Sequence, residues 1–175
     1  MVGTDDELIG LLAARHLAAK GHRVIATVIG PRARRVTQAR LRGYQKGLDE
    51  ADLHFDERLV VEGGIDAGAA GLATVQLLQR VPEVTAIFAQ NDYMAVGVLK
   101  ALSDSGKRVP EDCAVIGCDD IEMAAFTTPP LTTIHVPFFE TGAQAMRLLI
   151  EMINNGAVAP RKLVLPVHLV TRESS

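Results

Sequence analysis

The sequence predicts an α/β fold: a Rossmann-like parallel sheet with helices on both faces. Short apolar stretches rich in β-branched residues alternate with longer stretches whose apolar residues recur every three or four positions, as in a helix. The alternation continues from the N-terminus to about Asp119. Short strands that alternate with single helices in this way are typical of a parallel sheet covered on both sides.

The expected elements follow one another in order. Leu8, Leu11, Leu12 and Leu17 give the first helix its apolar period, and Gly21 ends it, so we expect the chain to open directly on a helix. Further helices are predicted over 36–51, 67–79 and 94–103. Strands are predicted over 24–29, 59–61, 84–89 and 114–117.

The regular alternation of predicted strands and helices stops after Asp119. A short acidic turn or helix leads to Pro129 and Pro130, which cannot continue a helix, so we expect the chain to cross to another part of the molecule here. A helix over 138–153 follows, and then two extended stretches over 163–165 and 167–170, separated by Pro166.

The 138–153 helix has an unusually apolar face, which must be buried. It packs either on the predicted sheet or on a partner that this chain does not contain. The face comprises Phe138, Gly142, Ala145, Leu149 and Ile153.

Composition excludes several classes of protein. The 175 residues, 48% of them hydrophobic, suffice for one substantial domain, and a net charge of −3 is unsuited to a stand-alone nucleic-acid binder. Cys113 and Cys118 have no metal-ligand spacing and are expected to be buried thiols of a reduced, intracellular protein. No apolar run approaches the roughly 20 residues of a membrane span, and the acidic N-terminus does not resemble a signal peptide. We therefore expect a cytoplasmic protein with no metal, cofactor or membrane partner.

Polar residues that directly follow predicted strands are the first candidates for a binding site, because ligands of such sheets bind beyond the strands' carboxyl ends. Asn91 offers a donor and an acceptor, and Asp119 can accept two hydrogen bonds from a vicinal diol. Asn and Asp are also favoured helix N-caps, so capping is an alternative for both. For Asp92 and Asp120, which follow them, capping is the favoured interpretation.

Three further residues lie outside the strand ends. Arg40 stands at the edge of the apolar face of its helix and needs a buried carboxylate or ligand oxygen as partner, unless its head group reaches water. Asp5 opens the first helix and suits a cap or a site. Phe138, at the start of a helix, is either core or a surface that stacks on a sugar ring.

The sequence contains no recognisable catalytic constellation. The motifs HExxH, GxSxG and SxxK are absent, and the glycines around position 64 match neither GxGxxG nor the P-loop. We therefore predict a binding protein and not an enzyme.

Several segments, taken in order and at family spacing, resemble landmarks of the LacI/GalR (lactose-repressor) family of transcriptional regulators. They are HLAAKGHRVIA (16–26), GP (30–31), RLRGY (40–44), AIFAQNDYMAVG (86–97), VPEDCAVIGCDD (109–120), PPLTTI (129–134) and LVTRES (169–174). The resemblance extends from about Asp5 to the last residue. It implies a periplasmic-binding-protein type I fold, in which two Rossmann-like subdomains hold an effector between them and control a DNA-binding helix-turn-helix.

The resemblance also assigns roles by position. Asp5, Arg40, Asn91 and Asp119 match effector-contacting positions. Ile65 lies where some members place a ring-stacking tryptophan, and Phe138 matches an aromatic residue of the cleft. The effector is then a small polyhydroxylated molecule such as a sugar.

Against the family pattern, the chain lacks the helix-turn-helix, the hinge helix and most of the first subdomain, so we expect a truncated sensor domain. Residues 5–136 correspond to the second, C-terminal subdomain, 137–156 to a crossover helix of the first subdomain and 157–175 to returning strands. We expect a homodimer that contacts DNA only through the helix-turn-helix that this chain lacks. The rival interpretations are a sugar receptor of a transport system with the same fold and, third, a Rossmann-like enzyme.

Overall fold

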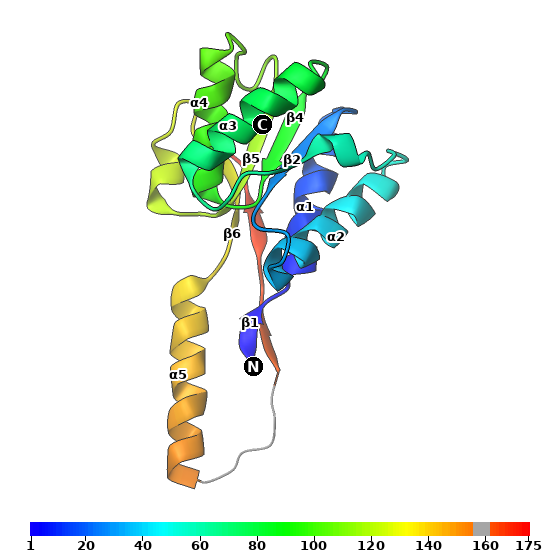
Figure 1. Ribbon diagram of the computed structural model, residues 1–175. Helices are drawn as coiled ribbons and strands as arrows, with labels where there is room; N and C mark the ends of the chain where they lie inside the picture. Colours follow the sequence, from blue (N-terminus) through cyan, green and yellow to red (C-terminus); the bar gives the residue numbers. More distant parts are fainter. Residues whose placement is uncertain (156–161) are drawn as a thin grey trace.

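A mostly parallel sheet forms the centre of the structure, a computed structural model that describes residues 1–155 and 162–175 (Figure 1). Within these residues the sheet has six strands in the order β3-β2-β4-β5-β6-β8, and only β8 runs antiparallel to its neighbour. The strands are β2 (Ile25–Ile29), β3 (Val60–Glu62), β4 (Ala86–Ala89), β5 (Ala114–Asp119), β6 (Thr132–His135) and β8 (His168–Val170).

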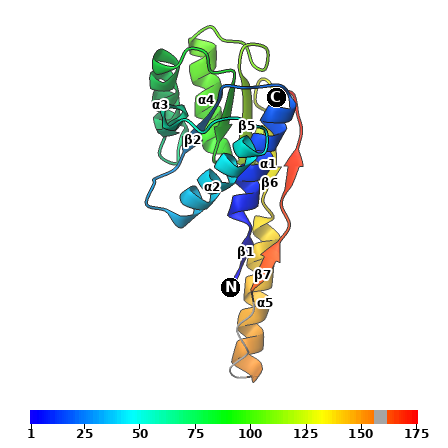
Figure 2. The ribbon, with the colours of Figure 1, turned by 90° about the vertical axis from the view of Figure 1, so that its right-hand side faces the viewer.

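Two helices cover each face of this sheet, as Figure 2 shows. α1 (Asp6–Ala19) and α2 (Arg35–Asp49) bury one apolar core against the sheet, and α3 (Ala67–Arg80) and α4 (Asp92–Asp104) bury the other. Every residue of β2 and β4 is therefore buried, which explains their uninterrupted apolar sequences. The prediction of an α/β fold with helices on both faces is confirmed.

An arm projects from the edge of this α/β body (Figure 1). It consists of α5 (Phe138–Asn155) and of β1 (Val2–Thr4) paired in parallel with β7 (Leu163–Leu165). α5 lies beside β1 and leads away from the six-stranded sheet, so its apolar side chains stay largely exposed. These exposed residues are Phe138, Phe139, Met146, Leu149, Ile150, Met152 and Ile153.

Two expectations about the elements are wrong. The chain does not open on a helix, because Val2–Thr4 forms β1, whose partner β7 lies at the other end of the sequence. Nor does it leave the sheet after Pro130: β6 follows at once, parallel to β5. Its residues Thr132, Thr133 and Ile134 are β-branched and buried, and the prolines precede the strand, where no ladder hydrogen bond is lost.

The sequence also predicted buried cysteines and no membrane span. Cys113 and Cys118 are free thiols, and both are buried, as predicted. Among the described residues no helix is long and apolar enough to cross a bilayer.

Candidate functional site

A cavity of about 200 Å³ opens at the carboxyl ends of β2, β4 and β5, where the strand order reverses between β2 and β4. Five of the residues predicted from the sequence line it together, although they come from five different segments of the chain. These are Arg40, Ile65, Asn91, Asp119 and Phe138, and the remaining lining residues are Gly30, Arg34, Val36, Thr37, Gln90 and Met94.

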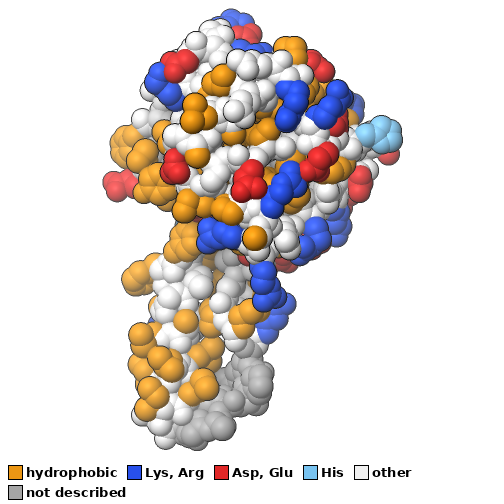
Figure 3. Space-filling view, viewed as in Figure 1, with side chains coloured by type: hydrophobic (Ala, Val, Ile, Leu, Met, Phe, Trp, Pro, Cys, Tyr) orange, Lys and Arg blue, Asp and Glu red, His pale blue; other side chains and the backbone are white. Residues whose placement is uncertain are grey.

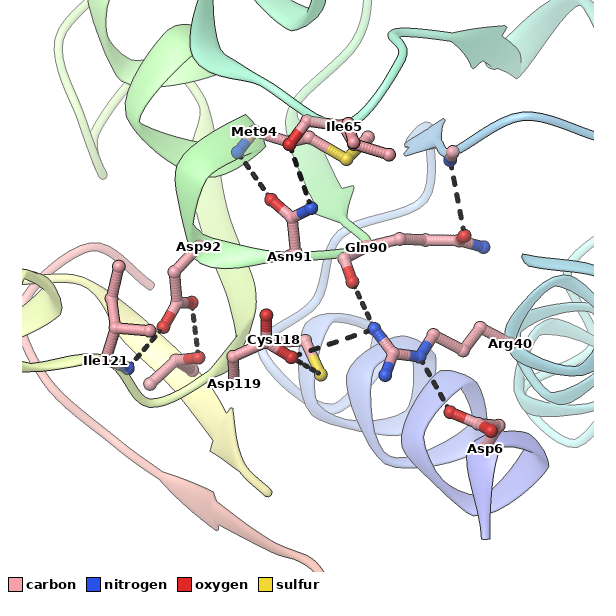
Figure 4. A network of polar contacts seen from close by, with 12 residues as sticks. Asp6, Arg40, Ile65, Gln90, Asn91, Asp92, Met94, Cys118, Asp119 and Ile121 are labelled. Atoms are coloured by element: carbon pink, nitrogen blue, oxygen red, sulfur yellow. Dashed lines mark hydrogen bonds and ion pairs between the residues drawn. The ribbon is translucent and has the colours of Figure 1, made fainter. Parts of the chain in front are cut away.

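Arg40 is held at the wall of this cavity by a network that Figure 4 shows. Its Nε donates to Asp6 Oδ1 at 3.1 Å, and its Nη1 donates to the carbonyl oxygen of Gln90 and lies 3.9 Å from Asp119 Oδ1. The side chain is only 11% exposed, so the alternative of a guanidinium in open water is wrong. A buried cation held between two carboxylates gives the cavity a fixed donor.

Close packing of α1 against α2 brings Arg40 to its partner. Gly10 and Gly43 lie at the crossing, where a Cβ on Gly10 would stand 1.9 Å from the carbonyl oxygen of Arg40. Only glycine allows the two helix backbones to approach so closely. Asp6, at the start of α1, can therefore reach across to α2.

Asp119 ends β5 with its side chain largely buried beside the same cavity. Its φ of 119° lies in a region that non-glycine residues rarely occupy, and Asp120 follows with a φ of 57°. Burial raises the pKa of the Asp119 carboxyl, and Arg40 and the Cys118 thiol oppose the shift only in part. Asp119 thus lines the cavity from a strained backbone conformation, and such strain is typical of functional sites.

Asn91 both caps a helix and lines the cavity. Its Oδ1 accepts from the backbone N–H of Met94 at 2.7 Å, so the capping interpretation is confirmed. Its Nδ2 donates to the carbonyl oxygen of Ile65 at 3.3 Å, which joins the α4 start to the loop after β3. The Ile65 side chain is 54% exposed at the cavity edge.

The capping interpretation is wrong for Asp92 and Asp120. The fully buried Asp92 carboxylate accepts from the backbone N–H of Ile121 at 2.9 Å and from Thr133 Oγ1 at 2.6 Å. Burial raises its pKa to about 6, although both hydrogen bonds oppose this. Asp120 instead pairs with Arg172 at 2.8 Å, and it lies 3.0 Å from a ring nitrogen of His135. Both carboxylates thus brace the turn that carries Asp119.

Asp5 and Phe138 lie where the body meets the arm. Asp5 accepts from the backbone N–H groups of Glu7 and Leu8 and caps α1; it lines a second, adjoining cavity and not the first. Phe138 lines both cavities and is 59% exposed, so it is not a core residue.

Sequence reasoning missed Gln90 and Asp6. Gln90 is buried, with its Nε2 donating to the carbonyl oxygen of Thr37 at 3.2 Å and its own carbonyl accepting from Arg40. It directly follows β4, so the strand-end rule that found Asn91 would also have found it. Asp6 left no such signal, because its role depends on the crossing of α1 and α2.

The described side chains around the cavity offer hydrogen-bonding groups beside apolar surface. Arg40 offers hydrogen-bond donors, Asp119 offers acceptors and Asn91 offers both. Ile65 and Phe138 add apolar surface, and the combination suits a hydroxylated ring. Within residues 1–155 and 162–175, no three His, Cys, Asp or Glu side chains cluster as metal ligands would.

The model of the periplasmic binding protein-like domain matches residues 14–175. The chain belongs to the periplasmic binding protein-like domain family. Its relatives include the HTH-type transcriptional regulator CelR of Thermobifida fusca, 40% identical over 165 residues, and the ribose operon repressor of Escherichia coli K12, 40% identical over 172 residues. These alignments cover 94% and 98% of this chain but 48% and 52% of the relatives, so the chain spans about half the length of the curated relatives it matches.

Solved structures of LacI-family regulators also resemble this chain. A CelR–cellobiose complex is 39% identical with a TM-score of 0.95, and it covers 98% of this chain and 53% of that one. A LacI-family regulator from Enterococcus faecium with bound ribose is 33% identical with a TM-score of 0.92, covering 98% and 63%. The relatives and structural neighbours are LacI-family regulators, which confirms the resemblance that the sequence motifs indicated.

Proposed function

We propose that this chain is the effector-binding portion of a LacI-type transcriptional regulator and that it binds a sugar or similar polyhydroxylated molecule. The observation that carries the proposal is the convergence of Arg40, Asn91 and Asp119 on one cavity at the reversal point of the sheet. A guanidinium, an amide and a carboxylate together can satisfy adjacent hydroxyl groups of a ring. The cellobiose-bound and ribose-bound neighbours support a sugar as the ligand class.

Residues 5–136 then form one subdomain, and α5 with β1 and β7 belongs mainly to a second. Of the segments expected over 137–156 and 157–175, residues 156–161 lie outside the described residues. Phe138 begins the arm and lines the cavity, so a ligand held there touches both parts. A ligand that binds more tightly when the parts are closed together shifts the population toward that closed state. The exposed apolar face of α5 would pack on the remainder of the second subdomain in a protein of the relatives' full length.

Such a regulator works as a homodimer on chromosomal DNA in the cytoplasm, and a helix-turn-helix outside these 175 residues would read the operator. We place the dimer contact on the α3–α4 face, where a groove of about 470 Å³ is lined mainly by small and apolar residues, including Gly71, Leu72, Val75 and Val96. Leu72 is 70% exposed there, which suits a contact between copies better than a free surface.

Thermal unfolding in the presence of a sugar panel tests the proposal. A ligand that binds only the folded chain raises the midpoint of unfolding, and the rise increases with the logarithm of ligand concentration above the Kd. We expect at least one mono- or disaccharide to raise it, and we expect Arg40→Gln to abolish the rise. A panel in which no sugar shifts the midpoint would contradict the proposed function.

A further inference from the structure

The second, larger cavity, next to the proposed sugar site, is lined by more basic than acidic side chains. It measures about 780 Å³ and shares Arg34, Val36, Arg40 and Phe138 with the first cavity, so the two are continuous. Its charged lining residues are Asp5, Asp6, Glu7, Arg34, Arg35, Arg40, Arg42 and Lys162.

Each acidic residue in this lining already has a partner. Asp5 accepts from the two backbone N–H groups that start α1, and Asp6 accepts from Arg40 at 3.1 Å. Glu7 lies 3.5 Å from Arg42. Asp5 is thus the one carboxylate of this lining without a cationic partner among the described residues, and the five basic side chains outnumber the three acidic ones by two.

The side chains of Arg34, Arg35 and Lys162 have no hydrogen bond or ion pair with any described residue, although other surface arginines, such as Arg58 and Arg108, are paired. Lys and Arg side chains gather where the body meets the arm in Figure 3. Three unpaired cations, against the single carboxylate of Asp5, leave this concave space with an excess of positive charge suited to an anion.

The start of α2 adds to this potential. Arg34 is its N-cap and Arg35 its first residue, with no side-chain acceptor for the free backbone N–H groups and no acidic residue in the first turn. The starts of α1, α3 and α4 each have an Asp or Asn that accepts such a bond. Free N–H groups and the helix dipole favour an anion at the same place as the arginines.

We infer that the effector of this chain is an anionic sugar, whose phosphate or carboxylate group binds Arg34, Arg35 and Lys162 while its hydroxylated ring occupies the first cavity. The inference rests on the proposed function and narrows its ligand class. Arginine matches the paired oxygens of either anion, and the continuity of the two cavities allows one molecule to occupy both.

Matched pairs of neutral and charged sugars test the inference on the full 175-residue chain. Calorimetry compares glucose with glucose 6-phosphate and with gluconate, and ribose with ribose 5-phosphate. We expect at least one charged member to bind at least about tenfold more tightly than its neutral parent, with a preference that weakens as salt is added. The two glucose derivatives show whether the site prefers phosphate or carboxylate.

Variants show whether the preference arises from these residues. In Arg34→Gln/Arg35→Gln the ratio of charged to neutral affinity should fall toward one. The matched control is Arg23→Gln, an exposed arginine at the opposite end of β2, which should keep the wild-type ratio.

Four outcomes would overturn the inference. Neutral sugars that bind as well as their charged partners would refute it and leave the proposed function intact, whereas no binding of any sugar would refute both. A preference for charged sugars that survives in the double Gln variant would mean that the anion binds nonspecifically. So would equal affinity of wild type and the double Gln variant for inorganic phosphate alone.

Discussion

In the proposed site we expect sugar recognition to depend most on Asp119, because this acceptor is largely buried beside the cavity and held in a strained conformation. Asp119→Asn keeps the size of the side chain and suits a positive φ, but it replaces one oxygen acceptor with a donor. We expect affinity for the effector to fall about 10- to 100-fold, with little loss of stability.

Calorimetry and thermal unfolding of Asp119→Asn would measure both effects. Asp104→Asn is the control, since Asp104 is exposed at the far end of α4 and, within the described part of the chain, forms an ion pair with Lys100 alone. Equal effector affinity in wild type and Asp119→Asn would remove Asp119 from the site.

Asp92 predicts a pH-dependent stability. Its folded pKa of about 6 exceeds its ordinary value of 3.8, so between these values the native state keeps a proton that the unfolded state loses. This contribution to stability is complete below about pH 4 and is lost as the pH rises to about 6. Asp92→Asn has no such proton and can still pair with Ile121 and Thr133. Its stability relative to wild type should therefore rise by up to about 3 kcal/mol from pH 4 to 7.

Urea unfolding at the two pH values measures this difference, and the other carboxylates cancel because both proteins share them. Asp92→Ala should be less stable than wild type at both values, since it leaves the Ile121 N–H and the Thr133 hydroxyl without a partner. A wild type and an Asn variant with parallel pH profiles would show that Asp92 ionises normally.

At the level of single residues, the sequence indicated which side chains follow the strands but not how each is used. Asn91, Asp119 and Arg40 were found because strand ends and helix periodicity place them beside the cavity. The difference between Asn91, which caps α4, and Asp92, which braces the turn after β5, depends on tertiary neighbours that are distant in sequence.

The crossing of α1 and α2 is the helix contact that most directly supports the site. A Cβ on Gly43 would lie 1.8 Å from the carbonyl oxygen of Glu7, so Gly43→Ala must push the helices apart. We expect a loss of about 1–3 kcal/mol in the free energy of unfolding, together with weaker effector binding, because Arg40 moves with α2.

Gly142→Ala in α5 is the matched control. No atom lies within 4 Å of the Cβ it would add, so the better helix propensity of alanine should stabilise α5 by up to about 1 kcal/mol. Chemical denaturation compares the two variants. If Gly43→Ala is as stable as wild type, the crossing is looser than the structure indicates.

The elements themselves were predictable where the local pattern is strong. The strands and helices of the body alternate clearly, and α5 was expected over nearly its observed length. β1 was missed because three residues cannot show a period and its partner β7 lies at the other end of the chain. β6 was missed because two prolines were interpreted as the exit from the sheet, although they only precede the strand.

For the molecule as a whole, the exposed groove between α3 and α4 predicts self-association. Leu72→Glu places a charge on the most exposed apolar residue of that groove and should convert a dimer into monomers. Light scattering after size exclusion measures the mass. Leu149→Glu, on the exposed face of α5, tests the competing surface: if it alone dissociates the dimer, the copies meet through the arm.

The combination of body and arm was predicted only through resemblance to a family. The apolar face of the 138–153 helix indicated a missing partner, but the projection of α5 away from the sheet depends on the whole chain. Likewise the strand-end rule predicted the edge of the sheet at which the cavity opens, and the crossing of α1 over α2 shapes its wall in a way that no local pattern shows.

The central claim is that a sugar-like effector binds at the carboxyl ends of β2, β4 and β5. A titration of the isotope-labelled 175-residue chain with the sugars of the panel, followed by backbone and side-chain NMR spectra, locates binding directly even when affinity is weak. We predict shifts at Gly30, Gln90, Asn91 and Asp119, with the spectrum of the α3–α4 groove unchanged. Shifts confined to other surfaces, or none at saturating sugar, would contradict the account.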